Sequence, residues 1–154
     1  MTFEEVKEFA AIYHHKFVVL KFMNNIIQDL MWRAEQHDMS KFDEQEFKTL
    51  VALIADIQKH PYGTPEHEEM RKKYAAEFAI HHSKNRHHPE HFKNGVEEMN
   101  LMDLLEMLCD WKAASMRQES GGNIENSLKI GAEKYNIPPV LLKILENTAK
   151  ACKM

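Results

Sequence analysis

Residues 2–37 read TFEEVKEFAAIYHHKFVVLKFMNNIIQDLMWRAEQH, a stretch that contains neither glycine nor proline. Apolar side chains recur in it every three or four residues, which is the spacing of one face of an α-helix. They are Val6, Phe9, Ala10, Tyr13, Phe17, Leu20, Phe22, Ile26, Ile27, Leu30 and Met31. Thr2 and Glu5 have the spacing of a capping box. We therefore expect one long helix, or two helices with a bend near residues 23–25.

The rest of the chain also has helical periodicity, and no segment alternates as a strand would. A helix is expected from about Asp43 to a turn at residues 61–63, and a second from 65 to 82, where Thr64 and Pro65 form a start signal. Residues 83–100 are polar and rich in histidine, which predicts a long functional loop with at most a short helix in it. Further helices are expected from about 100 to 121, 124 to 135 and 138 to 151. The sequence thus predicts one all-α domain over residues 1–154, a bundle of about five to seven helices.

Composition narrows the class of protein. The chain has 154 residues, 44% of them hydrophobic, and a formal net charge of −4. A protein that binds nucleic-acid polymers would normally be basic, so we expect no such binding. Its apolar runs are too short for a membrane span, and no signal peptide is indicated. Cys109 and Cys152 form no metal or disulfide motif. We expect a cytoplasmic protein with reduced thiols.

Histidine and aspartate follow a distinctive order. The chain has 10 histidines, and five of them lie between His81 and His91. His14-His15 fall in the first helix, His37-Asp38 at its end, His81-His82 at the end of a later helix, and Asp110 in the helix after the polar loop. Imidazole and carboxylate groups brought together from several helices are a known way to build a metal site in a helical bundle.

This order resembles that of the HD-domain superfamily of metal-dependent phosphohydrolases, which are helical bundles. The resemblance implies that His15, His37, Asp38 and Asp110 bind a divalent metal, with His14 as the alternative to His15. Members with two metals have further histidine ligands between the His-Asp pair and the late aspartate. The resemblance assigns that role to His81 and His82, and more weakly to His60.

Two further resemblances rest on shorter stretches. Residues 37–41, HDMSK, resemble the His-Asp-x-Gly-Lys stretch of HD-GYP phosphodiesterases, but Ser40 replaces the glycine and the Gly-Tyr-Pro signature is absent. Residues 37–42, 85–92 (NRHHPEHF) and 110–114 (DWKAA) resemble a group of small uncharacterised phage- and bacterium-encoded proteins. That resemblance covers most of the chain and names no substrate.

The ligand types indicate one or two divalent ions of Mn, Fe, Co, Ni or Zn. Asp38 could bridge two ions with its two oxygens, and a metal would supply hydroxide near neutral pH from a bound water. Lys41, Arg86 and Arg117 are candidates for contacts with an anionic substrate. For catalysis the candidates are Asp38, Lys41, His87 and His88. The positions of His87, His88 and His91 fit a ligand, a substrate contact or a surface loop equally well.

We therefore predict a metal-dependent phosphohydrolase that acts on a nucleotide or another small phosphate ester. One alternative is an HD-type oxygenase with a di-iron site, and another is a protein that binds a metal or ligand without catalysis. A homodimer is compatible with the sequence, and no membrane partner is expected.

Overall fold

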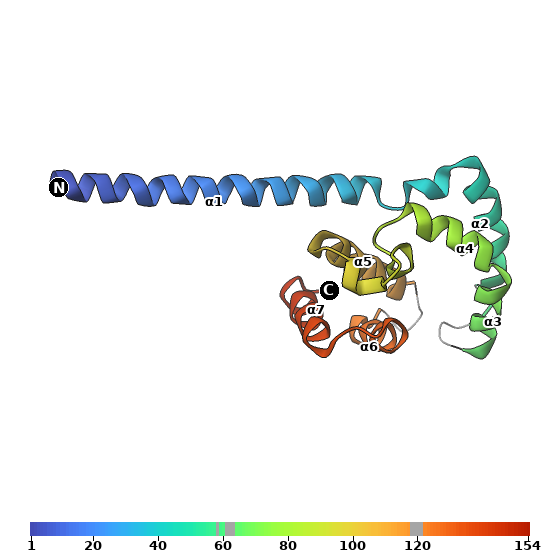
Figure 1. The fold of residues 1–154 in the computed structure, drawn as a ribbon. Helices are drawn as coiled ribbons and strands as arrows, with labels where there is room; N and C mark the ends of the chain where they lie inside the picture. The colour runs from blue at the N-terminus through green and yellow to red at the C-terminus, as the bar shows by residue number, and fades with distance from the viewer. Residues whose placement is uncertain (58, 61–63, 118–121) are drawn as a thin grey trace. The chain divides into compact units, whose positions relative to one another are not determined.

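A computed structural model describes residues 1–57, 59–60, 64–117 and 122–154 (Figure 1). The chain separates into two compact units, Met1–Gln36 and His37–Met154, and each is described by itself. All regular elements of the described residues are helices, so the prediction of an all-α fold is confirmed. The expectation of one domain over residues 1–154 stays a prediction.

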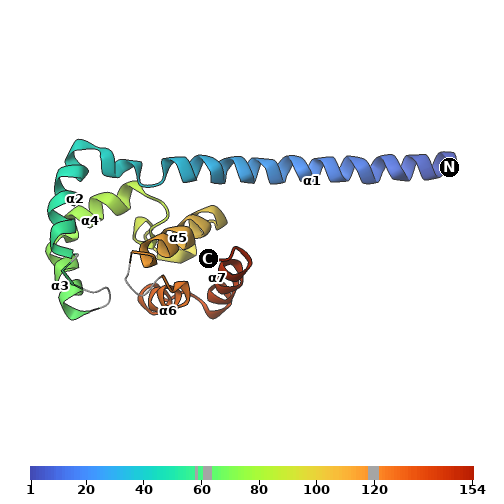
Figure 2. The ribbon, with the colours of Figure 1, turned by 180° about the vertical axis from the view of Figure 1, so that it is seen from behind.

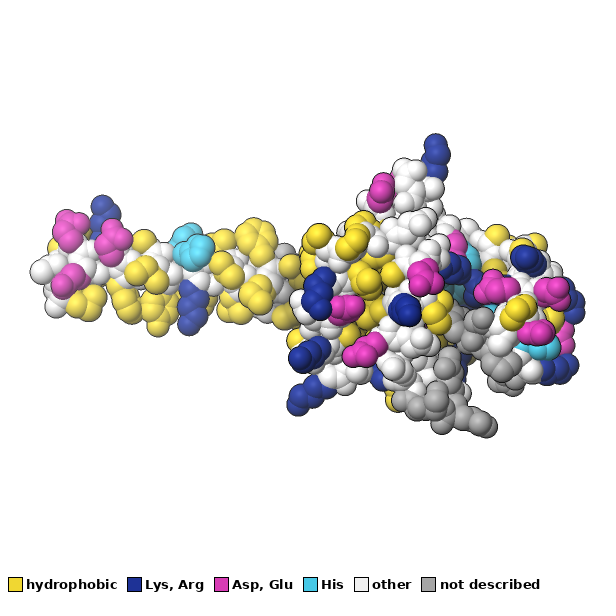
Figure 3. Space-filling view, turned by 90° about the horizontal axis from the view of Figure 1, so that it is seen from below, with side chains coloured by type: hydrophobic (Ala, Val, Ile, Leu, Met, Phe, Trp, Pro, Cys, Tyr) yellow, Lys and Arg dark blue, Asp and Glu magenta, His cyan; other side chains and the backbone are white. Residues whose placement is uncertain are grey.

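The first unit is the single helix α1 (Phe3–Gln36), and it is continuous through residues 23–25. Its start is the predicted capping box. The backbone N–H of Glu5 donates to Thr2 Oγ1 at 3.2 Å, and the backbone N–H of Thr2 donates to Glu5 Oε2 at 2.7 Å. Figure 3 shows hydrophobic side chains along much of the helix. Although α1 is long, the described residues contain no helix apolar enough to cross a bilayer.

The second unit begins at His37-Asp38, which leads into the short 3₁₀ helix η1 (Met39–Phe42) and then α2 (Glu44–Ile57). The turn predicted at 61–63 lies outside the described residues. Thr64 caps the next helix as predicted, because its side chain accepts from the backbone N–H of His67 at 3.2 Å.

The single helix predicted over 65–82 was wrong. Tyr74 (φ −104°, ψ 25°) breaks it into α3 (Pro65–Lys73) and α4 (Ala75–Lys84). The tyrosine hydroxyl donates to Asp56 Oδ2 in α2 at 2.9 Å. This tertiary contact has no signal in the helical periodicity of the sequence, and the break lets α4 run in its own direction past α2 (Figure 1).

The polar segment 83–100 is more ordered than a plain loop. It contains two 3₁₀ helices, η2 (Pro89–His91) and η3 (Gly95–Glu98), and leads into α5 (Leu101–Ser115). Asn100 and Asp103 form a capping box at the start of α5. The helix ends at Ser115, earlier than the predicted end at 121.

Helices α5, α6 (Ile124–Tyr135) and α7 (Pro139–Ala151) surround the core of the second unit (Figure 2). The buried residues of this core are Val96, Leu104, Met107, Leu108, Ile124, Leu128, Ile137, Leu145 and Ala149. Trp111 packs against this core and stacks on Tyr135, with ring centroids 6.0 Å apart. The indole occupies the space that a Cβ would need at Gly131, which explains a glycine in the middle of α6. The core fixes α5, and α5 in turn carries Glu106 and Asp110.

Candidate metal centre

Asp38 lies at the middle of a group of histidines. Its backbone adopts the left-handed conformation (φ 56°, ψ 16°), which aspartate tolerates better than most residues. The side chain is 15% exposed. Burial opposes its negative charge, but hydrogen bonds from His81 and Lys41 and the positive charge of Lys41 prevail, so the pKa of Asp38 lies well below its usual value. The carboxylate is therefore ionised at neutral pH.

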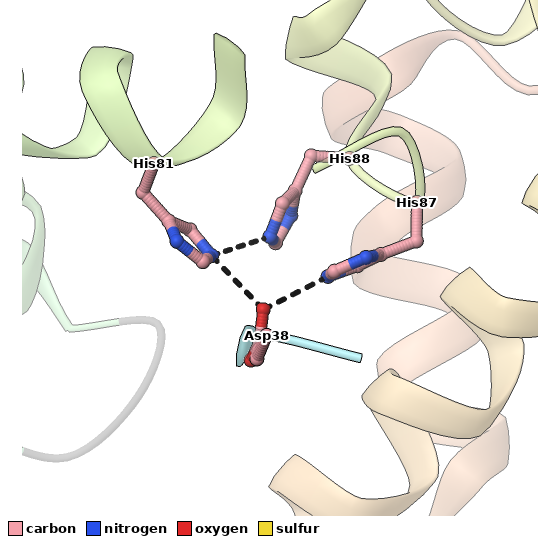
Figure 4. A group of neighbouring side chains, drawn as sticks. All are labelled: Asp38, His81, His87 and His88. Carbon is pink, nitrogen blue, oxygen red and sulfur yellow. Dashed lines mark hydrogen bonds and ion pairs between the residues drawn. The ribbon is translucent and has the colours of Figure 1, made fainter. Parts of the chain in front are cut away.

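Imidazoles from three parts of the second unit direct Nε2 at this carboxylate. Figure 4 shows two of them, those of His81 and His87. Nε2 of His81, from α4, lies 3.2 Å from Asp38 Oδ1, and Nε2 of His87 lies 3.5 Å from the same oxygen. Nε2 of His37 lies 3.4 Å from the other oxygen, Oδ2. His88 adds a fourth ring, with Nε2 at 3.0 Å from Nε2 of His81.

The other ring nitrogen, Nδ1, of His37, His81 and His87 faces a glutamate. Oε1 of Glu106 lies 3.0 Å from Nδ1 of His37 and 3.0 Å from Nδ1 of His87. Oε2 of Glu46 lies 3.3 Å from Nδ1 of His81. A carboxylate that accepts from Nδ1 fixes the tautomer and turns the lone pair of Nε2 toward a metal, and this arrangement is typical of metal-bound histidines.

Asp110 completes the centre on the α5 side. Its Oδ1 lies 3.6 Å from Nε2 of His37. Hydrogen bonds to Asp110 and Glu106 raise the pKa of His37 to about 10, against the opposing effect of burial. In the metal-free protein His37 therefore carries a proton, so the surrounding carboxylates already favour a positive charge at this position.

These residues form two overlapping sets whose ligand atoms all lie within 4.8 Å of one another. One set is Asp38, His81, His87 and His88, and the other is His37, Asp38, His87 and Asp110. We call their union the Asp38 centre. The His87 side chain is 1% exposed, and its Nε2 has no hydrogen-bond partner among the described residues. A buried imidazole nitrogen without such a partner costs free energy unless it binds something else. The Asp38 centre can thus hold a metal ion.

The comparisons with known proteins name a family. Residues 4–151 match the profile of a family of unknown function, DUF5662. The chain belongs to this family. No curated protein and no solved structure matches it. The family carries no assigned activity, so membership alone assigns no reaction to this DUF5662 protein.

The second unit of the DUF5662 protein brings together most of the predicted metal ligands. His37, Asp38, His81 and Asp110 all belong to the Asp38 centre. His82 instead forms a separate set with His88 and Glu90. His14 and His15 are exposed on α1, in the unit described by itself, and the prediction that one of them is a ligand remains untested.

The residues predicted to act in catalysis or substrate binding differ in what they contact. His87 and His88 have the positions of ligands, and the pKa of His88 is lowered to about 2, chiefly because burial disfavours the charged ring. Lys41 contacts Asp38 Oδ2. The guanidinium of Arg86 binds both carboxylate oxygens of Asp103, at 3.2 and 2.9 Å.

Three further predicted positions lie apart from these contacts. Arg117 is exposed beyond the end of α5, and His60 precedes the segment that the structure leaves undescribed. Nδ1 of His91 lies 3.0 Å from the backbone oxygen of His82. Their roles in binding stay predictions.

Glu106 and Glu46 are the important residues that sequence reasoning missed. The signal for Glu106 was present, because it lies four residues before Asp110 and therefore on the same side of the helix. Glu46 had no such signal. Its contact with His81 joins α2 to α4, residues 35 positions apart.

Proposed function

We propose that this DUF5662 protein is a metal-dependent phosphohydrolase of the HD type that acts on a small phosphate ester. The proposal combines the resemblance of the His-Asp order with the donor set of the Asp38 centre. Imidazole-rich sites with a few carboxylates suit Mn, Fe, Co, Ni or Zn better than Mg or Ca. Bound there, such an ion would polarise a phosphate oxygen and lower the pKa of a water.

One observation supports the proposal most strongly: His37, His81 and His87 all turn Nε2 toward Asp38 while a glutamate faces Nδ1. A protein that needed these residues only for packing would not require the same orientation three times. The two oxygens of Asp38 face different imidazoles, which suits a carboxylate that bridges two ions.

The remaining groups have roles that follow from charge. Lys41 contacts Asp38 and is 31% exposed, so its ammonium could also reach a phosphoryl oxygen next to the centre. The low pKa of His88 keeps its ring neutral, which suits a metal ligand better than a proton donor. Asp38 would hold the ion, and through its charge it keeps the surrounding rings oriented.

The test compares Asp38→Asn with Glu97→Gln, a change of an exposed carboxylate in η3. Each protein is loaded in turn with Mn, Fe, Co, Ni and Zn. Bound metal is measured by mass spectrometry of the digested protein, and phosphate release is followed on a panel of nucleotides and simple phosphate monoesters. We expect wild type and Glu97→Gln to retain metal and turnover. Asp38→Asn should lose both by more than the roughly 10- to 100-fold that removal of a supporting carboxylate costs.

Retention of wild-type rates by folded Asp38→Asn would contradict the hydrolase proposal. The donor set also suits iron, so oxygen uptake is measured on the iron-loaded protein in parallel. Oxygen-dependent turnover without phosphate release would favour the di-iron oxygenase instead. Metal binding without either reaction would favour a non-catalytic metal protein.

A further inference from the structure

His81 and His82 are neighbours on α4 but face different surroundings. Successive side chains on an α-helix point about 100° apart. His81 accordingly lies against Asp38, while His82 lines an open pocket of about 400 Å³. The lining residues are Arg71, Ala75, Phe78, Ala79, His82, Ser83, Glu90 and His91. The pocket is thus made by α3, α4 and η2.

A third set of ligand atoms lies beside this pocket, and two of its residues, His82 and Glu90, line it. His82, His88 and Glu90 each offer one ligand atom, and these atoms lie within 4.8 Å of one another. The rings of His82 and His88 have centroids 4.6 Å apart. His82 comes from α4, whereas His88 and Glu90 flank Pro89 at the start of η2.

Glu90 is held in place by neighbours that contact one of its oxygens. The hydroxyl of Tyr135 donates to Oε1 at 2.7 Å, Lys134 Nζ donates to it at 3.2 Å, and Arg71 Nη2 lies 4.0 Å from it. Since these contacts fall on Oε1, an ion that bound through Oε2 would leave them intact. The carboxylate is therefore oriented before any ion arrives.

We propose that His82, His88 and Glu90 form a second metal site, which shares His88 with the Asp38 centre and binds Zn²⁺ or a similar divalent transition ion. Two imidazoles and one carboxylate are a donor set that zinc takes when its fourth position stays open. Here the fourth position would face the pocket. The site does not depend on phosphohydrolase activity.

His88 belongs to both sets, and this couples the two sites. Its ring centroid lies 4.9 Å from that of His81 and 4.6 Å from that of His82. A neutral imidazole offers one nitrogen lone pair and therefore binds one ion at a time. An ion in the pocket that takes His88 removes one ligand from the Asp38 centre, so occupation of the second site would change metal binding at the first.

The test is a zinc titration of the whole metal-stripped protein against a chromophoric chelator. His82→Ala and Glu90→Gln remove pocket ligands, and His91→Ala is the matched control, because His91 lines the same pocket outside the ligand set. We expect His82→Ala to bind one zinc fewer than wild type. Glu90→Gln should lower the affinity for the same zinc ion at least about tenfold. His91→Ala should bind as many zinc ions as wild type.

Coupling is read from the visible spectrum of cobalt bound to the Asp38 centre. Added zinc should change this spectrum at lower zinc concentration in wild type than in His82→Ala, in which zinc can act only by displacing the cobalt. Equal zinc counts in wild type and His82→Ala, or an equal loss in His91→Ala, would overturn the site. Loss of the pocket zinc in Asp38→Asn would show one joint cluster rather than two sites. These counts involve no turnover, so absence of phosphate release would affect only the proposed function.

Discussion

Nδ1 of His37 lies 3.0 Å from Oε1 of Glu106, and the same oxygen lies 3.0 Å from Nδ1 of His87. One carboxylate in α5 thereby orients two rings that come from other parts of the second unit. Since each ring turns Nε2 toward Asp38, Glu106 links the packing of α5 to the geometry of the Asp38 centre.

Replacement of Glu106 should therefore weaken metal binding without removing a ligand. We expect Glu106→Ala to lower affinity by about 10- to 100-fold, the usual cost of a lost supporting carboxylate. Glu106→Gln keeps one acceptor oxygen and should lose less. Competition with a chelator of known affinity measures both, and Glu97→Ala is the exposed control. Unchanged affinity in Glu106→Ala would refute the orienting role.

Acid should destabilise the metal-stripped protein through His82 and His88. Burial lowers the pKa of His82 to about 4 and that of His88 to about 2, whereas an unfolded histidine titrates near 6.5. Below about pH 6.5 the unfolded chain binds protons that the native rings do not, so stability falls as pH drops toward 4. Urea unfolding at pH 7 and pH 5 measures this loss. It should shrink in His82→Gln and persist in His14→Gln, a change on the surface of α1.

The ion pair between Arg86 and Asp103 should stabilise the segment that carries His87 and His88. Asp103 is fully buried, and Arg86 contacts both of its oxygens. Lysine keeps the charge but cannot reproduce this two-point contact. We expect Arg86→Lys to cost about 1–3 kcal/mol in the free energy of unfolding and also to weaken metal binding. Arg117→Lys, on an exposed arginine, is the matched control. If both variants behave alike, the pair has no special role.

Gly131 should tolerate no side chain. A Cβ there would collide with the indole ring of Trp111. Although alanine favours helices, overpacking of this kind typically costs about 1–3 kcal/mol, and we expect a net loss of stability in Gly131→Ala. Thermal unfolding measures it, with Ser127→Ala as a control in the same helix. The smaller ring of Trp111→Phe should partly rescue Gly131→Ala, and absence of rescue would contradict the steric account.

Patterns among residues close in sequence predicted much of the helical structure of this protein. The capping box at Thr2, the cap at Thr64 and the helices around the core follow from contacts within a few residues of sequence. The break at Tyr74 did not, because it accompanies a hydrogen bond to Asp56 across 18 positions. The sequence did not predict the partner of Arg86 either, since any exposed arginine could contact an anionic substrate. Only the fold shows that Asp103 lies beside it.

The sequence by itself determined the helical class and the residue types of the Asp38 centre, because periodicity and side-chain chemistry are local properties. Only the tertiary structure decided which histidines belong to the Asp38 centre and which to the set beside the pocket. Adjacent His81 and His82 separate, because the helix turns them to different sides, and His88 comes to lie between the two groups. It also decided which carboxylates support the rings, since Glu46 and Glu106 reach their histidines only when α2, α4 and α5 pack together.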